Sequence, residues 1–71
     1  MNGRTERACY ERRQRGETWG AVGAQFWETP PPEWGGTVRQ WQALKASCAA
    51  SRHALRAGRP WPIRQRVERE E

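Results

Sequence analysis

Residues 37–58 read TVRQWQALKASCAASRHALRAG and carry the strongest helix signature of the chain. Thr37 and Gln40 have the spacing of a capping box, in which each side chain accepts a hydrogen bond from the backbone N–H of the other residue. At the far end, Gly58 is of the residue type that most readily adopts the left-handed conformation that ends a helix. The sequence therefore predicts one long helix from Thr37 to about Ala57.

The predicted long helix has two different faces. Its larger apolar side chains form a stripe about 60° wide on a helical wheel. The stripe consists of Trp41, Leu44, Cys48 and Leu55. The opposite face is nearly all alanine, at Ala43, Ala46, Ala50, Ala54 and Ala57. Because alanine is the strongest helix former, we expect this face to lie bare in solvent; the alternative is that its smoothness admits a second helix at short range.

Two shorter helices are predicted earlier in the chain. Residues Arg4 to Arg15 are rich in Arg, Glu and Gln, and Gly16 can end this helix in a left-handed conformation. Thr18 is a good N-cap for a second helix that extends to about Trp27. The apolar side chains of the second helix have the spacing of one buried stripe, formed by Trp19, Val22, Phe26 and Trp27.

Two glycines lie inside this second helix. Gly20 and Gly23 each cost about 1 kcal/mol relative to alanine in a helix interior. We expect the missing side chains to let another helix approach closely, because close packing would offset that loss.

The segments outside the helices are rich in proline. Residues 28–36, ETPPPEWGG, cannot form a continuous helix, and their three prolines predict a stiff connector. From Arg59 onward, RPWPIRQRVEREE has no clear period and predicts an irregular basic arm, partly disordered, that wraps the body through Trp61 and Ile63. We therefore expect an all-α fold, with a three-helix domain over residues 1–58 and a C-terminal arm over residues 59–71.

The core of such a domain must be small. The chain has 71 residues, of which 35% are hydrophobic, and only seven residues are Leu, Ile, Val or Phe. A division into two domains is therefore excluded. Five tryptophans argue against a disordered chain, and we expect at least three of them to be buried. Because so small a core stabilises a fold only weakly, we expect a partner protein, a nucleic acid or a second copy in a homodimer to add stability.

The net charge of +5 is unevenly distributed along the sequence. Residues 17–36 carry three Glu and no base, whereas residues 37–66 carry six Arg, one Lys and no acid. Codon bias could account for the preference for Arg over Lys, but it does not explain the missing Glu. A cationic stretch without anions is the electrostatic footprint of a surface that meets phosphates or an acidic protein.

Several classes of function are excluded or disfavoured. Two cysteines, Cys9 and Cys48, and one His are too few for a closed zinc site, and we expect both thiols to be small buried side chains. Residues 37–66 hold no carboxylate that could orient Ser47, Ser51 or His53 for catalysis, so we expect neither an enzyme nor a cofactor. The absence of a long apolar run predicts no membrane association and a cytoplasmic location in a bacterial or phage-infected cell.

The order of two short helices and one longer basic helix resembles the helix-turn-helix DNA-binding domain of small phage and plasmid regulators. The matching residues are Trp19, Val22 and Gly23 in the first helix of the motif, and Thr37, Val38 and Trp41 in the second. The connector is longer than the usual three to four residues and would have to loop out. The resemblance implies that the start of the second motif helix enters the major groove through Thr37, Arg39, Gln40, Gln42 and Lys45.

Two hypotheses for function follow. In the first, the protein is a non-enzymatic regulator that binds double-stranded DNA, with phosphate contacts from Arg52, Arg56, Arg59 and Arg64. In the second, it is a small interaction module, such as a phage-type inhibitor or an accessory subunit, that docks on an acidic protein through Trp and Arg. RNA binding is a third alternative that the sequence leaves open.

Overall fold

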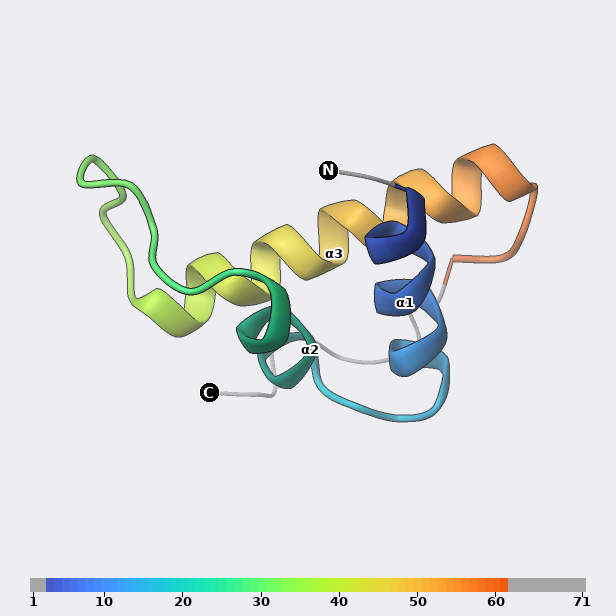
Figure 1. Cartoon of the computed structure of the whole chain (residues 1–71), viewed down its shortest axis with the longest axis horizontal. Helices are drawn as coiled ribbons and strands as arrows, with labels where there is room; N and C mark the ends of the chain where they lie inside the picture. Colours follow the sequence, from blue (N-terminus) through green and yellow to red (C-terminus); the bar gives the residue numbers. More distant parts are fainter. Residues whose placement is uncertain (1–2, 62–71) are drawn as a thin grey trace.

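The computed structural model describes residues 3–61 as three helices, α1 (Gly3–Gln14), α2 (Trp19–Phe26) and α3 (Val38–Ala57) (Figure 1). No strand occurs in this part of the chain. The two shorter helices both pack mainly on α3 and touch each other much less. The predicted all-α architecture of three helices is therefore confirmed.

The ends of the helices follow the local signatures. Thr37 and Gln40 form the capping box, with both hydrogen bonds at 3.0 Å. Gly58 ends α3 with a φ of 65°, in the left-handed region. The Thr18 hydroxyl accepts a hydrogen bond from the backbone N–H of Ala21 at 3.1 Å, which caps α2. These contacts satisfy backbone groups that would otherwise have no partner in the first and last turns.

The connector between α2 and α3 projects past the N-terminal end of α3 as a loop (Figure 1). Its turn is held by a hydrogen bond from the backbone N–H of Trp34 to the carbonyl of Pro31 at 3.0 Å. The indole Nε1 of Trp34 donates to the carbonyl of Thr37 at 2.9 Å and ties the loop to the start of α3. The prolines therefore separate the two helices, as predicted.

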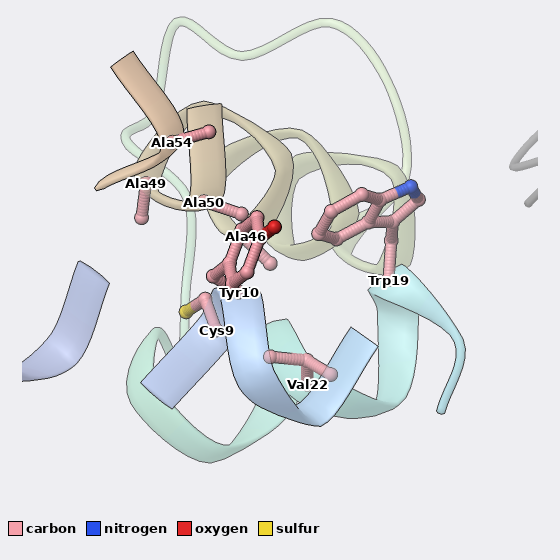
Figure 2. Packing of buried hydrophobic residues seen from close by; sticks show 8 residues of the cluster. All are labelled: Cys9, Tyr10, Trp19, Val22, Ala46, Ala49, Ala50 and Ala54. Atoms are coloured by element: carbon pink, nitrogen blue, oxygen red, sulfur yellow. The ribbon is translucent and has the colours of Figure 1, made fainter. Parts of the chain in front are cut away.

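The alanine face of α3 points into the core except at Ala57, at the end of the helix, so the expectation that this face lies bare in solvent is wrong. Four alanines of α3 are buried, and the core also contains Cys9 and Tyr10 of α1 and Trp19 and Val22 of α2 (Figure 2). The buried alanines are Ala46, Ala49, Ala50 and Ala54. Rings as large as those of Tyr10 and Trp19 need short side chains opposite them to fill the space at normal packing density.

Of the two glycines of α2, Gly23 allows the close approach that was expected of both. A Cβ atom added to Gly23 would lie 2.0 Å from the backbone oxygen of Gln42, so the backbones of α2 and α3 are nearly in contact there. A Cβ atom on Gly20 would instead meet the end of the Arg39 side chain. The helix propensity lost at Gly23 is therefore offset by close packing on α3, whereas Gly20 faces only the end of a flexible side chain.

The burial of the tryptophans differs from the prediction. Only Trp19 is buried in the described part of the chain, with 1% of its surface exposed, whereas Trp27, Trp34, Trp41 and Trp61 are half-buried. The expectation of three buried tryptophans is wrong because alanines, rather than indoles, occupy the inward positions of α3.

The start of the C-terminal arm returns to the body. The Trp61 ring stacks on the Trp19 ring, with centroids 5.5 Å apart and planes 21° from parallel. The Tyr10 hydroxyl donates a hydrogen bond to the carbonyl of Pro60. The predicted contact through Trp61 is thus confirmed, while Ile63 and the rest of the arm lie outside the described residues.

Candidate functional site

The outward face of α3 carries an apolar stripe, which we call the outer stripe and define as Trp41, Leu44, Cys48 and Leu55. Because a helix turns 100° per residue, these four positions lie opposite the buried alanines. Leu44 is 47% exposed and Leu55 82% exposed, and Trp41 and Cys48 are half-buried. The described residues thus leave large apolar side chains uncovered along one side of the longest helix.

A row of cations borders the outer stripe on one side. Lys45, Arg52 and Arg56 follow one another along this edge of α3, and no acidic residue lies on the helix. The Lys45 Nζ atom lies 5.8 Å from the centre of the Trp41 ring, so the cation covers one end of the stripe. Lys45 and Arg52 also line an open hollow together with Glu6 and Trp27.

One of these cations is engaged by the first helix. Arg56 Nη1 lies 2.6 Å from a carboxylate oxygen of Glu6, whose side chain is 4% exposed. The Arg56 guanidinium beside Glu6 lowers the pKa of this carboxyl, against the opposing effect of desolvation, and the charge of Arg52 lowers it as well. Arg56 therefore holds α1 to α3, which reduces its availability to an external anion.

The polar side chains predicted to read DNA bases already have intramolecular partners. The side chains of Thr37 and Gln40 form the capping box. Gln42 Nε2 donates to the carbonyl of Trp27 at 2.8 Å and to the carbonyl of Glu28 at 3.1 Å. These three side chains hold the start of α3 and the connector in place, so base contacts would have to use the hydrogen-bonding groups that those bonds leave over.

The other predicted site residues are separated along the molecule. Arg39 lies across Gly20 of α2, near the N-terminal end of α3. Arg59 is exposed just beyond the other end of the helix. Arg64 lies outside the described residues. The structure brings together Lys45, Arg52 and Arg56 along one edge of α3. The other predicted base-reading residues lie at the opposite end of the helix from Arg56 and Arg59, and they are Thr37, Arg39, Gln40 and Gln42.

The spacing of the apolar residues in the sequence indicates the outer stripe but does not indicate that it faces solvent. Gly20 and Gly23 contained the missing information, because two glycines one turn apart indicate a partner face that is also small. The alanine face of α3 is the partner that fits this requirement. Combining the two observations would have placed Leu44 and Leu55 on the surface.

The two cysteines have different surroundings and are both unpaired thiols. Cys9 is fully buried, as predicted, and burial raises its pKa from 9.0 to about 11. Cys48 lies half-buried in the middle of the outer stripe, which corrects the expectation that both thiols are buried. Within residues 3–61, no group of three or more His, Cys, Asp or Glu side chains could hold a metal ion.

Comparisons with protein-family models, curated proteins and solved structures found no match. None of the helices in residues 3–61 has the length and apolar character needed to cross a membrane. The outer stripe and its row of cations are therefore the features from which a function can be argued.

Proposed function

We propose that the protein is a non-enzymatic interaction protein that docks on an acidic partner protein through the outward face of α3. The observation that carries this proposal is the exposure of Leu44 and Leu55 in line with Trp41, beside Lys45 and Arg52. Scattered apolar residues are normal on protein surfaces, but a row of apolar side chains along one helix face with a charged edge is typical of an interface.

The composition of this face suits a protein partner. Tryptophan and arginine are enriched among the residues that contribute most to protein–protein binding, and both occur here in Trp41 and Arg52. Leu44 and Leu55 have no polar atom with which to contact a phosphate or a base edge. Since α3 has cations and no anions, an acidic partner surface would be attracted to it, whereas a basic one would be repelled.

Photo-crosslinking can test this proposal in an extract of the source cells. A benzophenone amino acid replaces Leu44 or Leu55 in the full chain, and Ala24, exposed on α2, provides the control position. We expect adducts from positions 44 and 55 that are destroyed by protease and survive nuclease, with far fewer from position 24. Equal adducts from all three positions, or adducts destroyed by nuclease, would contradict the proposal.

Binding of double-stranded DNA is a second candidate, supported by the cations of α3 and its end. Arg39, Lys45, Arg52 and Arg59 form no ion pair within residues 3–61, and α3 holds no acid that would repel phosphates. The helix-turn-helix resemblance belongs to this candidate. It ranks second because Thr37, Gln40 and Gln42 already have partners and because DNA offers little apolar surface to Leu44 and Leu55.

A salt titration with a labelled duplex tests the DNA candidate. If about six phosphates are neutralised, the affinity should fall on the order of 10³-fold between about 50 and 200 mM salt. The variant Arg59→Gln should weaken duplex binding, whereas Leu55→Ser should leave it unchanged. Absence of duplex binding at low salt, or binding that depends on Leu55 and not on Arg59, would count against DNA.

A further inference from the structure

The spacing of residues along the outer stripe indicates the kind of element that docks there. This inference rests on the proposed docking function. The outer stripe becomes a continuous line when the half-buried Ser51 is included, with intervals of three, four, three and four residues from Trp41 to Leu55. These intervals are those of two heptads in a coiled coil. We infer that the occupant of the outer stripe is one amphipathic helix, with acidic side chains beside its apolar seam, packed along α3.

The shape of the stripe favours a helix over an extended strand. Its positions span about 21 Å at 1.5 Å per residue, which is the length of four turns of a partner helix. The two ends carry large side chains, Trp41 and Leu55, and the centre carries Cys48 and Ser51, which are small. A partner helix can place bulky apolar side chains opposite this small centre, as knobs in holes.

The charges beside the stripe define the sequence of the partner. On one side, Lys45 and Arg52 occupy equivalent positions in successive heptads. On the other side, Gln40 and Ser47 are uncharged. Side chains at such flanking positions pair across a coiled coil and determine which helices associate. Glutamates on the partner opposite Lys45 and Arg52 would therefore be attracted, and lysines would be repelled.

The same charges disfavour a second copy of this chain as the occupant. In an antiparallel pair of α3 helices, Lys45 and Arg52 of one copy would face the same cations of the other. In a parallel pair, they would face Gln40 and Ser47, which provide no opposite charge. Neither orientation gains an ion pair, whereas an acidic helix gains one in each heptad.

A synthetic peptide provides the direct probe for this inference. It has three heptads, with Leu at both seam positions and Glu at both flanking positions, so that it suits either orientation and repels other copies of itself. A control peptide has the same composition, with its Leu residues moved to every second position. Titration calorimetry with the full chain measures binding of each peptide, and sedimentation measures the mass of the complex.

We expect a complex of one chain and one helical peptide, at least about tenfold tighter than that with the control peptide. Leu44→Asp and Leu55→Asp should weaken it at least about tenfold, and the matched surface change Ala24→Asp should not. Raising the salt to about 0.5 M should weaken it further, because the flanking pairs are screened. Equal binding of the two peptides, or binding unaffected by Leu55→Asp, would overturn the inference.

Cys48 supplies a second readout within the unmodified chain. Because it lies in the middle of the outer stripe, a docked helix should slow its alkylation by N-ethylmaleimide, while the control peptide should not. Cys9 is fully buried in both states and serves as the internal reference. Unchanged alkylation of Cys48 at a saturating concentration of the helical peptide would place the peptide elsewhere and overturn the inference.

The two proposals fail in different ways. If positions 44 and 55 give protein adducts but neither peptide binds, the docking function stands and the helical partner is wrong. If the photo-crosslinks fail as well, both proposals are wrong. If sedimentation of the free chain gives a dimer that Leu55→Asp dissociates, the occupant is a second copy and the acidic helix is excluded.

Discussion

The two faces of α3 differ in burial, and the more hydrophobic face is the exposed one. The inner face has only alanines at its buried positions, each at most 5% exposed, whereas the outer face carries Leu44 at 47% and Leu55 at 82%. The cause is the size of the side chains that α1 and α2 bring to the core, above all Tyr10 and Trp19. Large rings opposite small alanines form the core, and the larger aliphatic side chains remain outside.

Enlarging one inner alanine should produce the largest effect. Ala50 is fully buried between the helices, so Ala50→Leu should lower the free energy of unfolding by about 1–3 kcal/mol through overpacking. The same change at the exposed Ala57 should alter it by less than about 0.5 kcal/mol. Urea denaturation measures both variants, and equal losses at the two positions would mean that the inner face is not packed as described.

The close approach of α2 can be tested within a single helix. In Gly23→Ala, the new Cβ atom would meet the backbone of Gln42, so we expect a loss of about 1–2 kcal/mol despite the better helix propensity. In Gly20→Ala, the new atom meets only the flexible end of Arg39, so stability should be unchanged or rise by up to about 1 kcal/mol. Thermal unfolding measures both variants. A lower melting temperature for Gly20→Ala than for Gly23→Ala would contradict this account.

The ion pair between Glu6 and Arg56, at the border of the two faces, predicts a pH dependence. The pKa of Glu6 is lower in the folded chain than its ordinary 4.5, so the pair stabilises the fold above that value and this contribution is lost as the pH falls below it. The urea midpoint should therefore decrease from about pH 6 to about pH 3. Arg12 and Arg7 also lower the pKa values of Glu17 and Glu11, so part of the slope does not depend on Glu6.

The variant Glu6→Gln isolates the contribution of this pair. It should flatten the decrease in the urea midpoint between about pH 6 and about pH 3, because the side chain can no longer lose a charge. Glu33→Gln, on the exposed connector, should leave the slope unchanged. An identical slope in wild type and Glu6→Gln would show that Arg56 does not stabilise the charged form of Glu6.

Shortening the outer face should have the smallest effect on stability. Leu55 is 82% exposed, so Leu55→Ala removes few contacts and should change the free energy of unfolding by less than about 0.5 kcal/mol. Urea denaturation of this variant beside Ala50→Leu gives the contrast directly. A loss above about 2 kcal/mol would mean that Leu55 belongs to a core, because losses of that size follow the removal of buried Leu side chains.

The sequence was sufficient to predict the features that depend on neighbouring residues. The capping box of Thr37 and Gln40, the end of α3 at Gly58 and the proline connector are all determined within a few residues of the chain. The choice of the buried face of α3 depends instead on what α1 and α2 place opposite it. A helical wheel describes a single helix and does not include the size of the partners' side chains.

The candidate site was only partly predictable for the same reason. The cations Lys45, Arg52 and Arg56 were assigned to one edge of α3 from their spacing alone. The bonds of Gln42 to the carbonyls of Trp27 and Glu28 depend on the path of the connector, which no local pattern specifies. The contact between Arg56 and Glu6 likewise depends on the packing of α1 along α3.

The rates at which N-ethylmaleimide alkylates Cys9 and Cys48 test the orientation of α3 most directly, measured by mass spectrometry in the folded and the urea-unfolded chain. Because burial raises the pKa of Cys9 to about 11, its thiolate population falls about a hundredfold on folding, and its alkylation should slow by at least that factor. Cys48, on the outer stripe, should react in the folded chain within about tenfold of its unfolded rate. If Cys48 were instead protected to the same degree as Cys9, the outer stripe would be buried and the orientation of α3 described here would be wrong.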